Sequence, residues 1–324
     1  MTTGHERGTG KGLKDRDGVV VIGDALVDIV EDDDATESWH PGGAGLNVAI
    51  GIARQGMRAQ LAYPAAPDDP GRWLRETLDA EAVEVIALPS GPESGTARSR
   101  RIDGEPNYAF SAAVHDRQYT YPPDAVAQLR TARALAVSSF PLGDADQVEA
   151  LINVAHVCDL PLAVDPNVRP TLLGDRDRYR ANVLRLAEVA TLVKASRQDI
   201  ELLFPSPDDA VPQLRSAGTA AVVVTDGEDG ATVHTTKGSL HVPAASLNSP
   251  VVDTMGAGDA VFARLLVELV TENAGQDLSD WHRALTDAMA LARATCQVTG
   301  PLLPRSPAPA TPLASRTKEI SRWN

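Results

Sequence analysis

A single carboxylate stands at the start of an apolar helix in the segment Val252–Phe262. Asp259 directly follows the turn Gly256–Gly258, and the apolar residues of the helix recur at helical spacing: Val261, Leu265, Leu266 and Leu269. The first N–H groups of a helix have no partner within the helix, so this turn can hold an anion such as a phosphate. Asp259 could then accept the proton of a hydroxyl that attacks the phosphate. Its alternative role is to stabilise its own helix end, and this segment alone leaves both roles open.

The composition argues against several classes of protein. The chain has 324 residues and a formal net charge of -14, which disfavours nucleic acid or an anionic membrane surface as the main partner. No apolar run reaches the length of a membrane span, and Met1–Asp17 lacks the apolar core of a signal peptide. Cys158 and Cys296 lie in apolar, helix-like surroundings, which predicts reduced thiols rather than a disulfide. We therefore expect a cytoplasmic protein that binds neither nucleic acid nor membrane.

Short apolar runs alternate with helix-like segments along most of the chain. The run Val19–Ile22 ends at Gly23, as a buried parallel strand would. Similar runs are Ala134–Val137, Leu162–Val164, Thr191–Val193 and Ala221–Val224. The helix-like segments between them are Leu46–Gln55, Ala145–Val157, Arg178–Glu188 and Ala210–Ser216, and a late one is Thr286–Val298. This alternation predicts an α/β domain with a parallel sheet covered on both faces. Sites in such sheets collect at the carboxyl ends of the strands.

One region interrupts the alternation. Thr96–Ile102 and Glu105–Phe110 flank Asp103-Gly104, a dipeptide typical of a two-residue hairpin turn. Their polar side chains suit a thin exposed sheet, which we interpret as a small β-flap over the site, from about residues 96–121. A further strand is expected at residues 35–41. An ornamental surface hairpin is the alternative.

The two ends of the chain differ in composition from the rest. Met1–Asp17 is rich in glycine and charge and is predicted to be a disordered tail. Residues 305–324 are rich in proline and serine and are predicted to be a loose tail. A single domain is therefore expected at residues 18–304.

Four segments together resemble the signatures of a known family. Asp253–Asp259 looks like the C-terminal signature of the ribokinase-like (PfkB-type) carbohydrate kinases, and Gly42–Asn47 looks like their N-terminal Gly-Gly signature. Asp165–Pro170 is similar to a segment of the fructokinase and 2-keto-3-deoxygluconate kinase branches, and Thr225–Gly230 to the nucleotide loop. Their order and spacing match the family across nearly all of Val19–Pro304. The resemblance implies a ribokinase-like three-layer α/β/α fold, with a mostly parallel central sheet and a small β-lid.

The resemblance assigns the chemistry to the first segment described above. By position, Asp259 is the base that deprotonates a sugar hydroxyl. Gly256, Ala257 and Gly258 form the anion hole for the phosphoryl group that ATP donates. Phosphoryl transfer needs positioning and charge neutralisation more than covalent chemistry, which fits so small a set of catalytic groups.

The resemblance also implies a sugar-binding set near the first strand. Asp28 is expected to accept hydrogen bonds from sugar hydroxyls, whereas Asp24 is interpreted as a solvated loop charge. Gly42 and Gly43 let the backbone approach the sugar. The remaining expected substrate contacts are Asn47, Arg98, Asn167 and Arg169. For Arg169 the options are a contact to phosphate or to an anionic substrate group, or a structural role beside Asp165.

The nucleotide is expected on residues that follow two later strands. Lys194 faces its phosphates or is a solvated lysine, and Ser196 and Asp199 occupy the positions of the family's Asn-x-x-Glu motif. That motif organises Mg²⁺ through waters, so a water-mediated metal contact is assigned to Asp199. The full set expected to contact ATP is Lys194, Ser196, Thr225, Gly227, Gly230 and Gly258. Some relatives bind a monovalent cation such as K⁺ near the residues equivalent to Asp253-Thr254, and the sequence leaves this open.

The resemblance thus implies an ATP- and Mg²⁺-dependent sugar kinase. Fructose is the expected substrate because Gly23–Asp28 and Asp165–Pro170 look most like the fructokinase branch, and 2-keto-3-deoxygluconate kinase or ribose kinase is the alternative. A non-catalytic sugar-binding sensor is the alternative from another class, although it would not need both the anion-hole glycines and Asp259. Lids of this family often pair two subunits, so we expect a homodimer.

Overall fold

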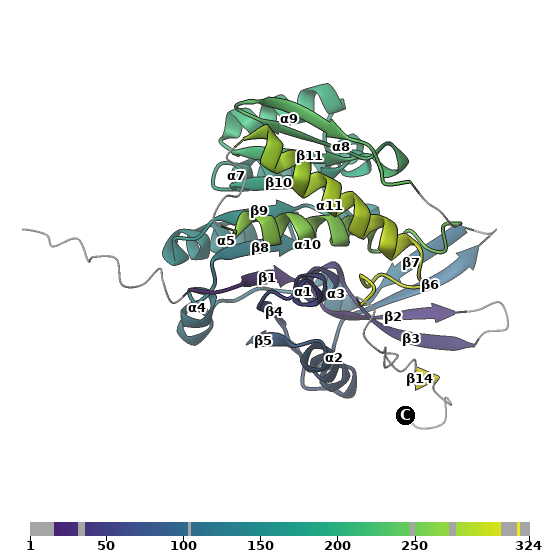
Figure 1. Ribbon diagram of the computed structural model, residues 1–324. Helices are drawn as coiled ribbons and strands as arrows, with labels where there is room; N and C mark the ends of the chain where they lie inside the picture. The colour runs from purple at the N-terminus through teal and green to yellow at the C-terminus, as the bar shows by residue number, and fades with distance from the viewer. Residues whose placement is uncertain are drawn as a thin grey trace, which may run out of the picture.

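A nine-stranded sheet with helices on both faces forms the body of the protein, and a five-stranded sheet projects from it (Figure 1). The computed structural model describes residues 16–31, 36–102, 105–246, 250–271, 277–305 and 316–317. The turn Asp103-Gly104 and most of the two expected tails lie outside the described residues. The arrangement confirms the predicted three-layer α/β/α fold with a mostly parallel central sheet and a small second sheet.

The large sheet is parallel except at one edge. Its strands lie in the spatial order β13 (Gly238–Val242), β12 (Ala231–Thr235), β11 (Ala221–Thr225), β10 (Leu192–Ser196), β9 (Leu162–Asp165), β8 (Ala134–Ser138), β1 (Val19–Gly23), β4 (Ala59–Pro64) and β5 (Val83–Leu88). The edge strands β12 and β13 run antiparallel to their neighbours. The remaining strands pair in parallel, so their carboxyl ends meet along one edge of the sheet.

The strand β1 shows why the sheet is covered on both sides. All of its residues are buried; Val19 and Val21 contact one hydrophobic cluster, and Val20 and Ile22 contact the other. Alternate residues of a strand point to opposite faces. A strand that is apolar at every position therefore requires helices on both faces.

The helices divide between these two clusters. Those on the first face are α1 (Ala44–Arg54), α2 (Asp69–Ala80), α10 (Ala257–Leu269) and α11 (Leu278–Cys296). Those on the second face are α4 (Pro123–Leu129), α5 (Ala145–Cys158), α7 (Arg176–Ala187), α8 (Arg197–Leu203) and α9 (Pro207–Ala217). The shorter α3 (Ala112–His115), α6 (Pro170–Leu173) and η1 (Gly227–Asp229) lie in connections. The sequence analysis did not find α2 and began α11 too late, at Thr286.

The small sheet is built from strands that precede α1 in the sequence and strands that follow α2. Its order is β14 (Arg316–Thr317), β3 (Glu37–Gly42), β2 (Leu26–Glu31), β6 (Thr96–Ile102) and β7 (Glu105–Phe110). The two strands predicted at residues 96–102 and 105–110 are confirmed, as is the strand near 35–41. Because β2 follows β1 after only Asp24-Ala25, Asp28 lies inside a strand that the sequence analysis missed. The strand β14 pairs with β3, so the described part of the expected loose C-terminal tail is attached to this sheet.

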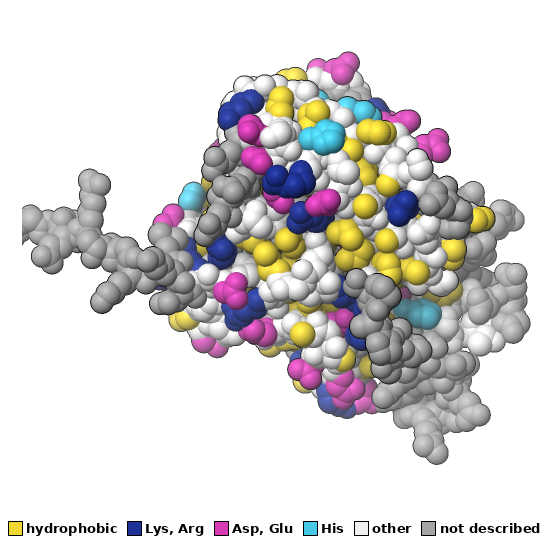
Figure 2. Space-filling model, viewed as in Figure 1, with side chains coloured by type: hydrophobic (Ala, Val, Ile, Leu, Met, Phe, Trp, Pro, Cys, Tyr) yellow, Lys and Arg dark blue, Asp and Glu magenta, His cyan; other side chains and the backbone are white. Residues whose placement is uncertain are grey.

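The outer surface of α10 and α11 carries charges of both signs side by side (Figure 2). Arg264 forms ion pairs with Glu268 and Asp287, and Arg283 forms one with Glu268. The charges on this face are therefore paired locally, two arginines with two acidic residues.

Two further expectations concern the thiols and the membrane. Cys158 and Cys296 are both free, as predicted. None of the described helices is both long and apolar enough to cross a membrane.

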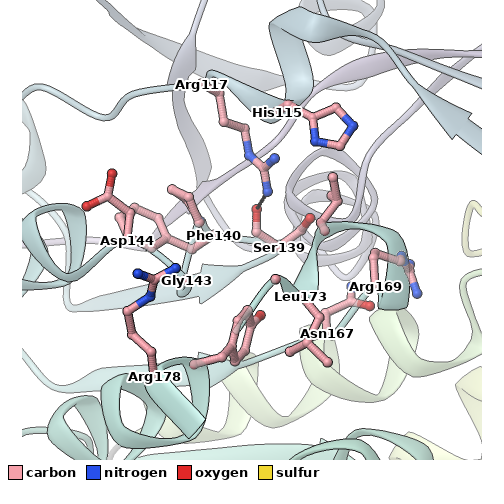
Figure 3. Close-up of a pocket in the computed structure, with 14 residues that line it drawn as sticks. His115, Arg117, Ser139, Phe140, Gly143, Asp144, Asn167, Arg169, Leu173 and Arg178 are labelled. Carbon is pink, nitrogen blue, oxygen red and sulfur yellow. Dashed lines mark hydrogen bonds between the residues drawn. The ribbon is translucent and has the colours of Figure 1, made fainter. Parts of the chain in front are cut away.

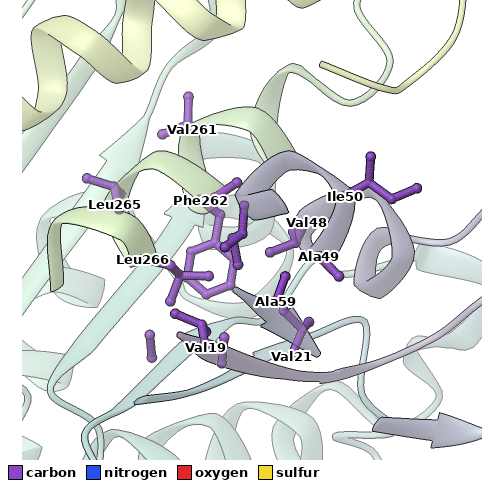
Figure 4. Close-up of a cluster of buried hydrophobic side chains, with 14 of the residues drawn as sticks. Val19, Val21, Val48, Ala49, Ile50, Ala59, Val261, Phe262, Leu265 and Leu266 are labelled. Carbon is purple, nitrogen blue, oxygen red and sulfur yellow. The ribbon is translucent and has the colours of Figure 1, made fainter. Parts of the chain in front are cut away.

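Helices α1 and α10 pack against each other over β1, and this contact positions their N-termini (Figure 4). Phe262 is completely buried and lies in one cluster with Val19 and Val48. A Cβ atom on Gly51 would lie 2.9 Å from the Cβ of Ala263. Glycine at position 51 therefore permits the close approach of the two helices.

Gly51→Val should lower the free energy of unfolding by about 1–3 kcal/mol, the usual cost of overpacking a core. Valine has a higher helix propensity than glycine, so a loss of stability must come from packing. Urea unfolding of the variant and the parent measures the difference. Gly91→Val is the matched control, because a Cβ there meets nothing within 4 Å. Equal stability of Gly51→Val and the parent would contradict the tight contact.

Candidate active site

A hydrogen bond joins the N-termini of α1 and α10 at the carboxyl edge of the large sheet. Asn47 Nδ2 donates to Asp259 Oδ2 over 2.8 Å, and each residue lies in the first turn of its helix. Asn47 Oδ1 is buried and has no hydrogen-bond partner among the described residues. Buried polar atoms are normally satisfied, so this oxygen is available to the hydroxyl of a ligand.

The turn before Asp259 presents free backbone donors. Gly256 caps α10 with a φ of 76°, and a Cβ there would lie 1.9 Å from the carbonyl oxygen of Pro301, so glycine is required. No acceptor from the described part of the chain is within hydrogen-bond range of the N–H groups of Gly258 and Asp259. These donors and the positive end of the helix dipole make a site for an anion. The sequence analysis predicted an anion hole at Gly256, Ala257 and Gly258. The N–H of Ala257 instead donates to the carbonyl oxygen of Thr254 at 3.3 Å, so the free donors among the described residues are Gly258 and Asp259.

A buried lysine adds a positive charge to this turn. Lys194 Nζ forms an ion pair with Asp165 Oδ2 at 2.8 Å, and both side chains are buried. A Cβ on Gly258 would lie 3.2 Å from Lys194 Nζ, so the ammonium group is beside the anion site. Burial lowers the pKa of Lys194, but the negative charges of Asp165 and two further aspartates outweigh it and raise the pKa. Lys194 is therefore a fixed cation rather than a solvated lysine.

The environment of Asp259 favours proton acceptance. Burial raises its pKa above the ordinary value of 3.8, while the hydrogen bond from Asn47 and the charges of Lys194 and Arg169 oppose the rise. A carboxylate with a raised pKa is a stronger base once it is ionised. Asp259 also keeps partial access to solvent, which a reacting hydroxyl needs. The turn can therefore bind a phosphate next to a base.

Asp28 approaches the site from the small sheet. A Cβ on Gly42 would lie 2.0 Å from Asp28 Oδ2, so glycine at position 42 leaves room for this carboxylate. Burial and the charge of Asp24 raise the pKa of Asp28 to about 7, while the charge of Arg169 opposes the rise. Asp28 therefore titrates near neutral pH.

Asp24 is buried and joins two elements, which corrects the prediction of a solvated loop charge. Its Oδ1 accepts a hydrogen bond from the N–H of Gly45 at 3.1 Å, and its Oδ2 accepts one from Ser139 Oγ at 2.8 Å. Gly43 has a φ of 102° directly before α1, and a Cβ there would lie 2.8 Å from the Asp24 carbonyl oxygen. Asp24 and Gly43 together fix the start of the helix that carries Asn47.

The segment after β9 lies next to these carboxylates. Asn167 has a φ of 42°, and its N–H donates to Asp165 Oδ1 at 3.2 Å. Arg169 is exposed, and its charge acts on both Asp28 and Asp259. Because Asp165 already pairs with a buried lysine, Arg169 does not supply its counter-charge.

Ser196 and Asp199 form a capping box at the start of α8. Asp199 Oδ2 accepts hydrogen bonds from the N–H and the Oγ of Ser196 at 2.8 and 2.7 Å, and its Oδ1 accepts one from the N–H of Val168 at 2.8 Å. A carboxylate has about four lone-pair sites, so Asp199 can still accept from a metal-bound water. Among the described residues there is no group of three or more His, Cys, Asp or Glu that could hold a metal ion. Indirect contact through water fits this carboxylate better than direct coordination.

The expected nucleotide loop follows β11. Thr225 ends this strand and lies opposite Ser196 of β10. Gly227 has a φ of 51° and open space around its Cα, so its backbone is accessible. Gly230 has a φ of 100°, and a Cβ there would lie 2.2 Å from the carbonyl oxygen of Val242. Gly230 is therefore required for packing against β13.

Arg98 is not brought to these residues. It lies opposite Ile29 of β2, and alternate residues of a strand face opposite sides, so Arg98 is on the other face from Asp28. Its guanidinium forms ion pairs with Glu37 and, at 3.8 Å, with Glu31. Both partners belong to the small sheet, so Arg98 stabilises that sheet and is left out of the substrate set.

Comparison with known proteins identifies the family. The pattern of the pfkB family carbohydrate kinases matches residues 16–308. The chain belongs to the pfkB family. It is 30% identical over 291 residues to the aminoimidazole riboside kinase of Salmonella typhimurium, with 87% of this chain and 88% of the relative covered. It is 29% identical over 265 residues to a fructokinase of Rhizobium leguminosarum bv. trifolii, with 79% and 80% covered.

The fold of this pfkB family protein also matches solved structures. A putative ribokinase II from E. coli in complex with ATP and Mg²⁺ superposes with a TM-score of 0.73 at 22% identity, covering 90% of this chain and 96% of that chain. The protein is accordingly an ATP-dependent carbohydrate kinase.

The sequence analysis gave no site role to Asp165 or to Ser139. A signal for the first was present, because Asp165 and Lys194 directly follow short apolar runs in the sequence, Leu162–Val164 and Thr191–Val193, and carry opposite charges. The role of Ser139 had no such signal. Its hydrogen bond to Asp24 spans 115 residues of sequence and depends on a positive φ of 54°.

The pfkB family protein should show a pH-dependent stability difference on Asp28→Asn substitution. The pKa of Asp28 rises from 3.8 to about 7 on folding, so the folded state binds this proton more tightly than the unfolded chain. The stabilisation of the folded state by this bound proton is fully present below about pH 4 and is lost as the pH rises through about 7. The unfolding free energy of the parent relative to Asp28→Asn should therefore fall over this range, by at most about 4 kcal/mol.

Urea unfolding at several pH values measures this difference. Asp287→Asn is the control, because Asp287 is an exposed partner of Arg264 away from the site. A parent-to-Asp28→Asn difference that stays constant with pH would contradict the raised pKa.

Proposed function

We propose that this pfkB family protein transfers the γ-phosphoryl group of ATP to a sugar hydroxyl, with Asp259 as general base and residues 256–258 as the anion hole. One observation carries the proposal. The Asp259 carboxylate, held by Asn47, stands beside free backbone N–H groups and the buried ammonium of Lys194. Base, anion site and cation are thus adjacent.

The sugar is held between the small sheet and α1. Asp28 accepts hydrogen bonds from its hydroxyls, and Asn47 Oδ1 is the unpaired acceptor for another. Gly42 and Gly43 allow its close approach, and Asn167 and Arg169 lie at its far side. Asp259 takes the proton of the reacting hydroxyl, and the N–H groups of the turn and Lys194 neutralise the charge of the transferring group.

The nucleotide lies over the ends of β10 and β11. Lys194, Ser196, Thr225 and Gly227 are its proposed contacts, together with Gly258 of the anion hole. Mg²⁺, when bound, neutralises phosphate charge, and Asp199 is the residue proposed to reach it through water. A monovalent cation near Asp253-Thr254 is an optional addition to the proposal, because a fructokinase of Vibrio cholerae was solved with a bound potassium ion.

Fructose is the proposed acceptor, on the resemblance of Asp165–Pro170 to the fructokinase branch and the fructokinases among the relatives. The alternatives are 2-keto-3-deoxygluconate and ribose. A sugar sensor without activity is disfavoured, because it has no use for a base next to an anion site. The expected homodimer through the small sheet stays a prediction, for which light scattering is the measurement.

Asp259→Asn should lower kcat by at least about 10²-fold, the usual effect of losing a general base. The substitution keeps the side-chain volume, and the amide oxygen that replaces the carboxylate can still accept from Asn47 Nδ2, so the variant should fold. Steady-state ADP release measures kcat. Asp287→Asn should keep the parent rate. A folded Asp259→Asn protein with near-parent turnover would show that Asp259 is not the base.

ADP release over a panel of sugars tests the reaction and its acceptor. The panel contains fructose, ribose, 2-keto-3-deoxygluconate and aminoimidazole riboside, each with parent and Asp259→Asn protein. We expect ADP release that depends on the sugar and on Asp259. Sugar binding by calorimetry without ADP release from any of them would favour the sensor.

A further inference from the structure

A cavity of about 220 Å³ lies next to the proposed acceptor site (Figure 3). It opens between the ends of β8 and β9 and the N-terminal part of α7. Four of its lining side chains are basic, namely His115, Arg117, Arg169 and Arg178, and we call this group the cationic pocket. Figure 3 shows Arg178 at one end of the pocket and Arg169 at the other.

The arginines of the cationic pocket have no direct carboxylate partner in the described part of the chain. No carboxylate of the described residues forms an ion pair with Arg117, Arg169 or Arg178. Arg117 instead donates to the backbone carbonyls of Val114 and Ser139. The chain contains 44 acidic and 30 basic residues, so acidic partners are plentiful elsewhere. Unpaired guanidinium groups around one cavity indicate an anionic ligand.

The acidic residue in the lining does not cancel this charge. Asp144 caps α5, and its Oδ1 accepts hydrogen bonds from the N–H groups of Asp146 and Gln147 at 2.9 and 3.3 Å. That carboxylate is therefore engaged with the helix N-terminus. The pocket keeps an excess of positive charge.

The cationic pocket shares two lining residues with the proposed acceptor site. Asn167 and Arg169 line it, and they belong to the segment that begins at Asp165, the partner of Lys194. Arg169 is also close enough to Asp28 and Asp259 for its charge to act on both. A ligand in the acceptor site can therefore extend past Arg169 toward Arg178.

The size of the cavity decides what part of a ligand it can take. At about 220 Å³ it is smaller than the pockets of about 300–1,000 Å³ that enclose whole drug-sized ligands. It is therefore too small for a nucleotide but has room for one carboxylate or phosphate group. The proposed nucleotide contacts also lie elsewhere, over β10 and β11.

We infer that the cationic pocket binds an oxyanion carried by the acceptor, either a carboxylate or a phosphate ester, and that the preferred acceptor is an anionic sugar. This inference rests on the proposed function and narrows its substrate class. The proposed function names fructose as the acceptor. On the present inference, the preferred acceptor is instead a relative of fructose that carries a carboxylate or a phosphate ester.

Matched acceptors test the inference. We would measure kcat/KM by ADP release for fructose, fructose 1-phosphate, fructose 6-phosphate and 2-keto-3-deoxygluconate. At least one anionic sugar should exceed fructose by about tenfold or more, the factor expected from a charge-assisted contact. A preference for a phosphate ester or for the carboxylate then identifies which oxyanion is bound.

A pair of variants on one helix locates the effect. Arg178→Gln should raise the KM for the preferred anionic sugar about tenfold or more and change kcat less, because Arg178 binds and does not react. Arg180→Gln is the matched control, since Arg180 lies two residues away on α7, pairs with Asp177 at 3.0 Å and does not line the cavity. Calorimetric titration of the same sugar without ATP should show the same difference between the variants.

The outcomes separate the two proposals. If fructose supports ADP release and no anionic sugar has a higher kcat/KM, the inference is overturned and the proposed function stands. An Arg178→Gln protein with the parent KM and the parent affinity for the preferred anionic sugar would also overturn the inference, because the pocket would then not contact the acceptor. Absence of ADP release with every sugar, neutral or anionic, would overturn the proposed function itself.

Discussion

The buried ion pair between Lys194 and Asp165 is the interaction on which the site depends. Removing two charges from water costs free energy that the pair recovers only with good geometry and further hydrogen bonds. Here the geometry comes from the register of the neighbouring strands β9 and β10, which places Asp165 at the end of β9 beside Lys194 within β10. The pair holds the ammonium next to Gly258 without a flexible, solvated side chain. A cation fixed in this way needs little rearrangement when a phosphate arrives, which is the condition for electrostatic catalysis.

Several aspartate side chains gather near the carboxyl edge of the large sheet, and the protein compensates their negative charges to different degrees. Asp165 is matched by a buried lysine, Asp24 by the N–H of Gly45 and the hydroxyl of Ser139, and Asp199 by Ser196 and a backbone N–H. Asp28 and Asp259 are less fully matched by hydrogen bonds and ion pairs; burial raises the pKa of both, as it also raises that of the lysine-paired Asp165 to about 6. The least compensated carboxylates are thus the ones proposed to contact the sugar. The matched carboxylates hold the framework in place, whereas Asp28 and Asp259 keep the capacity to accept hydrogen bonds or a proton from a ligand.

Much of the fold and the anion site could be predicted from local sequence. The turn before Asp259 is a contiguous motif with a helix after it, so its residue types alone indicate its shape. The strand β1 is apolar throughout and equally clear. The strands β12 and β13 escaped detection because their exposed faces interrupt the apolar run. The strand β2 escaped because its acidic end resembles a loop.

Roles that depend on tertiary pairing could not be predicted in the same way. Asp24 looks like a loop charge until Ser139 and Gly45 are placed beside it. Arg98 looks like a substrate contact until the register of β2 and β6 puts it on the face opposite Asp28. The helix spacing at Gly51 is likewise invisible in sequence, because its significance lies in the Cβ of Ala263.

The direct passage from β1 into β2 through Asp24-Ala25 has a consequence for how binding energy is used. Asp28 belongs to the small sheet, whereas Asn47 and Asp259 belong to the framework around the large sheet. A sugar that contacts both groups acts as a cross-link between two parts of the chain. Its affinity therefore depends on how these two parts are placed relative to each other as well as on each separate contact. Because the Asp24-Ala25 connection is buried and Asp24 is held by Gly45 and Ser139, the two parts are already set relative to each other before a ligand joins them.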